Sequence, residues 1–328
     1  MQSALHSPWQ PSCLIESLHR RAWMLSRIRA FFETRHVLEV ETPLLSHASG
    51  TDPQLAFFTS NYNTPPKTQT LFIQTSPEFA MKRLLASGSG SIYQICKAFR
   101  NGEAGRFHNP EFTILEWYRV GFDLNALMDE VEALFNDLFE GQLETSQRIA
   151  YSRIFEHYTG LNALTFSQQA YCEFAKRENL HDAMTICGDN HALWLDFLFS
   201  FCVQPHLGKN ALCLIYGYPA CQSSLARLNT DNPLLTDRVE VFINGVELGN
   251  GFYELTHSLE QNTRFEAEIA TRKLENLPTA TKDTRLLDAL EAGLPDCAGI
   301  AIGLDRVLMI LEKSTSISEV LSFDIARA

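Results

Sequence analysis

One segment, FRNGEAGRFHNPEFTILEWYR from Phe99 to Arg119, constrains the fold of this chain more than any other stretch. Its glycines and polar residues predict a loop, and the alternating FTILEWY that follows predicts a half-buried strand. Because side chains alternate between the faces of a strand, Phe112, Glu116 and Tyr118 are expected to share one face. The segment is either an ordinary hairpin with a charged tip or a site that combines an aromatic ring, a carboxylate and loop cations.

Composition limits the classes of protein that the chain can belong to. A length of 328 residues with 45% apolar residues is enough for one large α+β domain or two small ones. A net charge of −12 argues against a broad face for nucleic acid. The eight cysteines lack the spacing of a zinc site, and there is neither a signal pattern nor a long apolar run. We therefore expect a cytoplasmic protein.

The first third of the chain alternates between helical and extended patterns. Apolar spacing predicts a helix over residues 14–35, followed by a strand over 37–46. Since proline cannot donate to a ladder, Pro43 places that strand at an edge or an interface. The polar stretch 50–70 is expected to be a loop. A short strand, a turn and a helix that begins at Glu78 come next, and a carboxylate there is either a dipole partner or a binding group.

The middle of the chain predicts mostly packing elements. A helix over 124–139 follows the N-cap residue Asp123. Helices are expected near 166–180 and 191–203, and an apolar strand over 212–220.

A second chemical signal lies in RVEVFINGVELGNGFYEL, where Asn244-Gly245 predicts a two-residue hairpin turn. In the resulting register Glu240 and Glu247 are diagonal neighbours on one face, roughly 5–8 Å apart at Cβ. Such a pair suits Mg²⁺, which takes one or two carboxylates together with phosphate oxygens. The alternative is a solvated acidic hairpin. The following residues 249–251 predict a bulge that could turn Glu254 toward the same pocket.

The last element, AGIAIGLDRVLMILE, predicts a short strand over residues 300–302 and a helix after Gly303. Arg306 is expected in the first turn of that helix.

These segments resemble the three signature motifs of class II aminoacyl-tRNA synthetases, in the lysyl form. The pattern FRN…HNPEFT…E.Y is similar to motif 2, the strand up to Pro43 to motif 1, and AGIAIGLDR to motif 3. The WYR ending and PDCAGIAIGLDR are close to the EpmA family, also called PoxA or GenX. The resemblance implies an α+β fold, with an antiparallel sheet flanked by helices. It also implies a single catalytic domain over 1–328 without an N-terminal anticodon-binding domain, and a homodimer formed around Pro43.

The resemblance also assigns roles to individual positions. Catalysis is implied for Arg100, on the α-phosphate, and for Arg306, which would sandwich adenine with Phe112. The other positions implied to bind ATP are Asn101, Glu103, Arg106, His108, Asn109, Glu247, Leu248 and Gly303. The positions implied to bind the amino acid are Ser76, Pro77, Glu78, Glu116, Tyr118, Asn250, Phe252, Glu254 and Ala301. The implied Mg²⁺ ligands are Glu240 and Glu247.

The function implied by the resemblance is ATP-dependent activation of (R)-β-lysine and its ligation to a lysine side chain of bacterial translation elongation factor P. A minimal lysyl-tRNA synthetase, a non-catalytic regulatory paralogue and ligation to a small molecule remain alternatives. Two positions depart from the lysyl pattern: Gly102 replaces a glutamate, with Glu103 one residue later, and Ala301 replaces a glycine. The added methyl of Ala301 could shift preference toward a β-amino acid, which would leave the Ala301→Gly variant with a changed ratio of β-lysine to α-lysine activation.

Overall fold

The computed structural model describes residues 9–328, and the chain divides into two compact units. The first contains the described residues up to Val120 together with Thr256–Asp296 and Ala301–Ala328. The second contains Gly121–Leu255 and Cys297–Ile300. Both combine helices with strands, so the α+β class is confirmed. The single catalytic domain over 1–328 stays a prediction.

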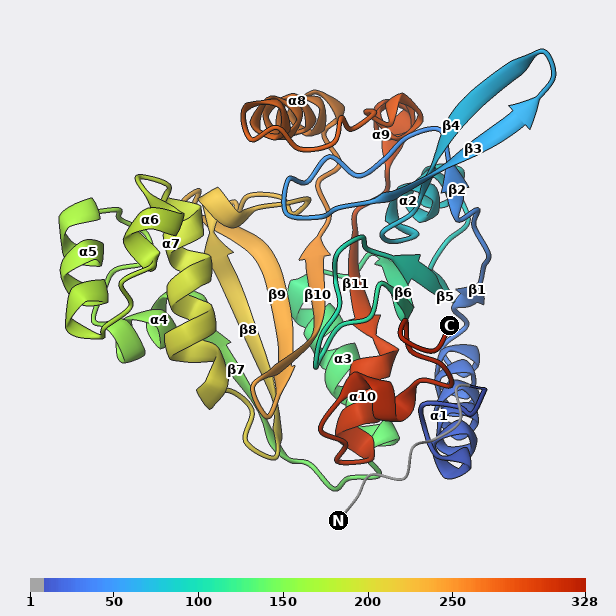
Figure 1. The fold of residues 1–328 in the computed structure, drawn as a ribbon, viewed down its shortest axis with the longest axis horizontal. Coiled ribbons are helices and arrows are strands. Elements are labelled where there is room, and N and C mark those ends of the chain that lie inside the picture. Colours follow the sequence, from blue (N-terminus) through green and yellow to red (C-terminus); the bar gives the residue numbers. More distant parts are fainter. Residues whose placement is uncertain (1–8) are drawn as a thin grey trace. The chain divides into compact units, whose positions relative to one another are not determined.

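The first unit has helices around a small group of strands (Figure 1). Its helices are α1 (Ile15–Glu33), α2 (Glu78–Ala86), α8 (Ser258–Leu274), α9 (Thr284–Gly293), α10 (Leu304–Leu311) and the short 3₁₀ helix η4 (Ile317–Val320). Its strands are β1 (Leu38–Glu39), β2 (Leu45–Ser46), β3 (Phe58–Thr64), β4 (Lys67–Ile73), β5 (Ile92–Phe99) and β6 (Glu111–Val120), with the last residues of β11 (Cys297–Gly303).

Strands β5 and β6 form the antiparallel hairpin that carries the motif 2 segment. On one face, Trp117 packs edge-on against Phe32 of α1, and Phe32 stacks on Tyr93 at 4.4 Å between ring centroids. The predicted alternation is therefore confirmed, because Phe112, Glu116 and Tyr118 lie on the face away from α1. The strand is nevertheless buried on both faces from residue 113 to 118, so the expectation of a half-buried strand was wrong.

The stretch between α1 and α2 departs most from the sequence prediction. The strand expected over 37–46 is reduced to the two-residue pieces β1 and β2, with Pro43 between them. The loop expected over 50–70 is largely the hairpin β3–β4, which projects beyond β2 in Figure 1. Its strands are rich in polar residues, and most of their side chains are exposed, although Leu71 and Phe72 of β4 are buried. The sequence there lacks the alternation of apolar and polar residues that predicts a strand.

The second unit packs helices against a larger set of strands (Figure 1). Its helical elements are α3 (Leu124–Leu138), α4 (Tyr151–Thr159), α5 (Gln168–Arg177), α6 (Ala183–Cys187), α7 (His191–Leu198), the π-helix η1 (Phe199–Val203) and the 3₁₀ helices η2 (Gln204–His206) and η3 (Ala220–Gln222). Its strands are β7 (Glu144–Ala150), β8 (Ala211–Pro219), β9 (Leu235–Ile243) and β10 (Val246–Tyr253), with the first residues of β11.

The strands of the second unit follow the order β10-β9-β8-β7. The pairs β10–β9 and β9–β8 are antiparallel, but β8 pairs with β7 in parallel, as β1 does with β5 in the first unit. The expected antiparallel sheet is therefore a mixed one. Helices α4 and α7 cover one face of β8, where Tyr151, Trp194 and Phe242 form part of a continuous aromatic core. Each large side chain buried there contributes roughly 1.5–3 kcal/mol of transfer free energy.

The hairpin β9–β10 has the predicted turn and register. Asn244 and Gly245 both have positive φ, Ile243 pairs with Val246, and Phe242 pairs with Glu247. The bulge, however, lies between Glu247 and Gly249 rather than over residues 249–251.

None of the helices in residues 9–328 combines the length and hydropathy needed to cross a membrane.

Candidate active site

The loop that joins β5 to β6 opens on Arg100, whose guanidinium lies 5.0 Å from the ring centroid of Phe112. Glu103 faces the same guanidinium at 3.8 Å. The Nε atom of Arg100 is buried and makes no hydrogen bond with the described residues. A half-buried arginine with an unsatisfied donor beside an aromatic ring is suited to bind a planar anionic ligand.

Gly102 explains one departure from the lysyl pattern. Its φ is +82°, and nothing lies within 4 Å of the position that a Cβ atom would take. There is therefore room for a side chain at this position. The backbone nevertheless favours glycine, because a left-handed φ strains other residues. A glutamate at this position would require a different turn, whereas Glu103 already lies beside Arg100.

Arg306 is in the first turn of α10, as predicted, and contacts the same loop. Its Nε donates to the carbonyl of Phe107 at 3.1 Å, and its Nη2 lies 2.7 Å from Nε2 of His108. Because arginine has only donors, Nε2 of His108 is the acceptor in this contact. The structure thus brings Arg306 and His108 together.

Asp305, which the sequence analysis did not single out, joins α10 to the motif 2 strand. Its buried carboxylate accepts from Arg21 of α1 at 2.5 Å and from the main-chain N–H of Thr113 at 2.7 Å. Arg306 follows Asp305 in α10, and Phe112 precedes Thr113 in β6. This bond therefore fixes the two elements that carry the proposed adenine-binding pair in the same part of the first unit.

The C-terminal segment holds the other side of the loop. Arg106 donates from Nε to the carbonyl of Thr315, and its own carbonyl accepts from the N–H of Ile317. The buried side chain of Asn109 accepts from the N–H of Ile325 and donates to the carbonyl of Glu111. These contacts favour a role for Asn109 in shaping the loop. Asn101 donates its main-chain N–H to Ala56, which ties the loop to the segment after β2.

Glu116 and Tyr118 form a buried pair on β6, with the Tyr118 hydroxyl donating to Glu116 at 2.7 Å. Burial raises the pKa of the neighbouring Cys96 thiol to about 12, and the charge of Glu116 adds to that rise. The face predicted to bind an amino acid therefore presents a buried carboxylate and a phenol, both of which suit an ammonium group.

Glu78 begins α2, as predicted, and its carboxylate accepts from the buried ammonium of Lys82 at 2.6 Å. Sequence reasoning missed Lys82, although the i, i+4 spacing of a glutamate and a lysine is a readable pairing signal. The hydroxyl of Ser76 accepts from the N–H of Glu78 and shapes the Ser76-Pro77 turn.

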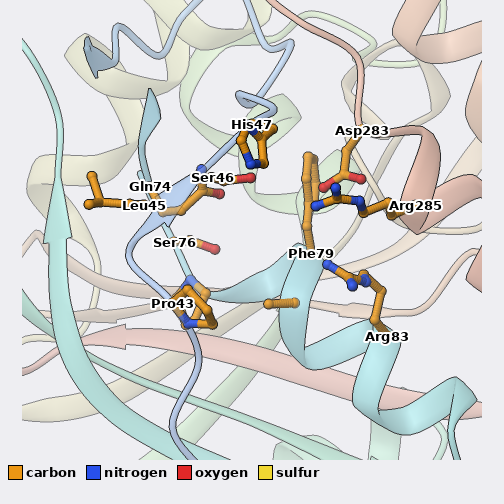
Figure 2. A pocket seen from close by; sticks show the side chains of 12 residues that line it. Pro43, Leu45, Ser46, His47, Gln74, Ser76, Phe79, Arg83, Asp283 and Arg285 are labelled. Atoms are coloured by element: carbon orange, nitrogen blue, oxygen red, sulfur yellow. The ribbon is translucent and has the colours of Figure 1, made fainter. Parts of the chain in front are cut away.

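A pocket of about 100 Å³ lies beside this turn in the first unit (Figure 2). Its lining includes Ser76 and Pro77 but not Glu78. In Figure 2, the side chains of Arg83 and Arg285 lie across the pocket from Pro43 and Leu45. The pocket is therefore on the motif 1 side of the turn.

Glu240 on β9 has a largely buried carboxylate, with 13% of its side chain exposed. It accepts from the Tyr218 hydroxyl and from the Arg238 guanidinium, at 2.5 and 2.6 Å. Burial raises the pKa of Glu240, against the guanidinium of Arg238, and the charge of Glu247 raises it further. Burial and the Glu240 charge hold the pKa of Tyr218 well above its usual range, so its hydroxyl stays a donor.

The register of β9 and β10 places Glu247 on the same face as Glu240, because Glu247 pairs with Phe242, two residues from Glu240. The bulge at Leu248 then brings Asn250 opposite Glu240. Each carboxylate oxygen has two lone pairs, so the two bonds to Glu240 leave acceptor capacity for a cation. Two nearby carboxylates that oppose each other's ionisation fit Mg²⁺. Groups of three or more metal-binding side chains are absent from residues 9–328.

Arg238 is the second group that sequence reasoning missed. It lies on β9 between the proposed metal and amino-acid residues, and its guanidinium contacts Asn250 and Glu240 while lying 4.5 Å from the ring centroid of Tyr218. Arg238 is two residues from Glu240 and therefore on the same face of the strand. This spacing could have identified it from the sequence.

The remaining substrate positions of the second unit are buried. Phe252 is opposite Arg238 on the hairpin, and Glu254 donates its main-chain N–H to Cys297 at the start of β11. A Cβ on Gly251 would approach the carbonyl of Gly299 at 2.9 Å and the Ile300 side chain more closely still, so only glycine fits there. Glycine at this position therefore lets β10 approach β11.

Ala301 and Gly303 lie on β11, and Gly303 is the N-cap of α10. The binding roles given to them, and to the other site residues, stay predictions.

Comparison with known proteins identifies the family of the chain. The family model for class II tRNA synthetases (D, K and N) matches residues 12–327. The elongation factor P–(R)-β-lysine ligase of Vibrio atlanticus is 44% identical over 326 residues, which is 99% of this chain and 100% of that protein. The proteins of the same name from Edwardsiella ictaluri and Salmonella dublin are 43% and 42% identical, each over 98% of both chains. The chain belongs to the class II tRNA synthetase (D, K and N) family and, within it, to the family of the elongation factor P–(R)-β-lysine ligases.

Proposed function

We propose that this protein activates (R)-β-lysine with ATP and ligates it to a lysine side chain of translation elongation factor P. The observation that carries the proposal is the contact of Arg306 with the Phe107–His108 loop, in a chain at least 42% identical to ligases of that name. ATP use is implied by the class II family.

The reaction has two steps. A carboxylate oxygen of β-lysine attacks the α-phosphorus of ATP, the bond to the bridging oxygen breaks, and pyrophosphate leaves. The neutral amine of the acceptor lysine then attacks the carbonyl carbon of the adenylate, the carbon–oxygen bond to AMP breaks, and the amine loses a proton. Neither step needs a nucleophile from the enzyme, so positioning and charge neutralisation supply the catalysis.

In the first unit, Arg100 and Arg306 would neutralise the charge that develops on the phosphates. Phe112 offers its ring to adenine, and Arg106 and His108 would meet the outer phosphates once Arg106 leaves the carbonyl of Thr315. In the second unit, Glu240 and Glu247 would hold the Mg²⁺ that accompanies ATP, and that ion would draw charge from the phosphates.

The residues proposed to bind the amino-acid substrate offer many hydrogen-bond acceptors. Two of them, Glu116 and Tyr118, are buried together, and Glu78 keeps its carboxylate beside Lys82. Glu254 is buried in the second unit. A substrate with two ammonium groups matches this excess of acceptors. We further propose that the enzyme is a homodimer assembled around Pro43 and that it acts without tRNA.

The deciding experiment is intact-mass analysis of purified elongation factor P after incubation with the protein, ATP and (R)-β-lysine. We expect a mass gain of one β-lysyl group, which the Arg306→Ala variant loses and the exposed Arg153→Ala variant retains. Pyrophosphate exchange would report the first step alone. Charging of tRNA in place of the elongation factor, or no exchange with any lysine isomer, would overturn the proposal.

A further inference from the structure

Arg238 makes three directed hydrogen bonds on the inner face of the β9–β10 hairpin. Its Nε donates to Oδ1 of Asn250 at 3.1 Å, its Nη2 to Glu240 at 2.6 Å, and its Nη1 to the carbonyl of Gln222 at 2.8 Å. The guanidinium also lies over the ring of Tyr218. A planar fork held on three sides and on one face leaves little freedom to rotate.

The chemistry of this contact fixes the orientation of the Asn250 amide. Arginine has five donors and no acceptor, so a side-chain amide that bonds to it must present its oxygen. Turning the amide around would place its NH₂ group against the guanidinium. The NH₂ group of Asn250 is therefore the end left to meet a ligand, and Asn250 acts as a donor.

A donor is the exception among the groups proposed to bind the amino acid. Glu78, Glu116, Tyr118 and Glu254 offer acceptors that suit ammonium groups. The substrate has one group that needs a donor, namely the carboxylate that attacks the α-phosphorus.

We propose that Arg238 is a positioning residue, which holds Asn250 so that its amide NH₂ binds and orients the substrate carboxylate. The inference rests on the proposed function and deepens it, because it assigns one contact to the nucleophile. Lysine cannot replace Arg238, since one ammonium cannot reach Asn250, Glu240 and the Gln222 carbonyl in fixed directions.

The test measures binding in the absence of metal and ATP. Calorimetry and thermal shift would compare (R)-β-lysine with the diamine in which hydrogen replaces its carboxylate. We expect Arg238→Met to weaken β-lysine binding about 10- to 100-fold, as loss of a hydrogen bond to a charged group does, and to leave diamine binding unchanged. Arg238→Lys should recover only part of the loss. A purely structural role would weaken both ligands equally.

Asn250→Asp keeps an oxygen for Arg238 but removes the donor, so it should weaken β-lysine binding at least as much, even if Arg238→Met folds poorly. Arg148→Met is the matched control, because that arginine in the same unit binds Asp129 and Glu132 instead. Wild-type protein that binds β-lysine no better than the diamine, or variants that bind β-lysine like wild type, would overturn the inference. If wild type binds neither ligand, this inference fails, whereas the proposed function is decided separately by the mass gain of the elongation factor.

Discussion

In the first unit, the loop with Arg106 and Asn109 is held by hydrogen bonds to a segment about 200 residues away in sequence, at Ile317 and Ile325. In the second unit, the hairpin β9–β10 is held by its own two-residue turn, by the largely buried side chain of Arg238 and by contacts that are nearer in sequence, such as those of the Asn244 and Gly245 N–H groups with the carbonyls of Gly208 and Leu207. Most residues of the loop are exposed, whereas Asn244 is the one exposed residue of the hairpin. We infer that the loop proposed to bind the nucleotide depends on contacts with residues distant in sequence. The hairpin depends on its own turn and on residues nearer in sequence.

The largest expected effect tests charge on the loop. Arg100→Ala should lower the rate of pyrophosphate exchange by about 10²- to 10³-fold, because a donor aimed at transition-state charge is removed. Stability should change little, since the Nε atom of Arg100 makes no hydrogen bond with the described residues and its ion pair with Glu103 spans 3.8 Å. Exchange assays and urea unfolding would measure the two effects. The exposed Arg177→Ala variant is the control, and a loss of exchange that merely follows unfolding would contradict this reading.

The next effect tests the long-range assembly of the first unit. Asp305→Asn should destabilise the protein by about 3 kcal/mol, because it leaves the largely buried Arg21 without its carboxylate. The KM for ATP should rise as well, since the single amide oxygen cannot accept from both Arg21 and the Thr113 N–H, and the NH₂ group then faces one of these donors and weakens the link between α10 and β6. The exposed pair of Arg29 and Glu39 provides the control, and Arg29→Gln should cost less than about 1 kcal/mol. Equal losses from the two variants would show that the Asp305 link carries no special weight.

This contrast also explains what the sequence could predict. The turn at Asn244-Gly245, its register and the shared face of the hairpin carboxylates follow from local patterns, and all were correct. The role of Asp305 was missed because its partner Arg21 lies in a distant element, whereas the pair of Lys82 and Glu78 was overlooked although its i, i+4 spacing is a local signal. The hairpin β3–β4 was missed because most of its residues are polar and exposed, so the sequence carries no alternation of apolar residues there.

The motifs gave candidate residues from both units, but not their supporting contacts. Family resemblance marked Asn250 and Glu240, whereas the bonds that Arg238 makes to both appear only when β9 and β10 are paired. Family resemblance indicates which residues contact a ligand. The residues that orient those ligand-binding residues are identified only from the packing in the structure.

A third, smaller effect concerns pH and the segment after β2, which supports Asn101. The Thr51 hydroxyl donates to Glu268 of α8, and Arg272 donates to the carbonyls of Asp52 and Leu55. Burial raises the pKa of Glu268 to about 7, while the Thr51 hydrogen bond opposes the rise. A carboxyl whose pKa is higher in the folded state costs stability as pH rises from its unfolded value through the folded one.

The protein should therefore lose on the order of 2–3 kcal/mol through Glu268 between pH 4.5 and about 7. Glu268→Gln keeps an acceptor for Thr51 and cannot ionise, so its stability should fall less over that range. Urea unfolding at about pH 4 and about pH 8, on the order of half a unit or more beyond each end of the transition, would measure the difference. Glu291→Gln, at an exposed position of α9, should behave like wild type. If it flattened the profile equally, the pH dependence would have another origin.

The smallest effect tests whether the hairpin is built locally. Asn244 has a φ of 51°, and its Oδ1 accepts from the N–H of Asn210 at 2.9 Å. Asn244→Gly accepts the left-handed φ and loses only that bond, so it should cost about 1 kcal/mol and leave pyrophosphate exchange unchanged. Asn244→Val keeps the turn at a higher cost, because a β-branched residue is strained at positive φ. The two variants therefore separate a missing hydrogen bond from backbone strain by urea unfolding. Should Asn244→Gly lower exchange as much as Asp305→Asn does, the hairpin would depend on distant contacts to the same degree as the loop, and the contrast between the units would be lost.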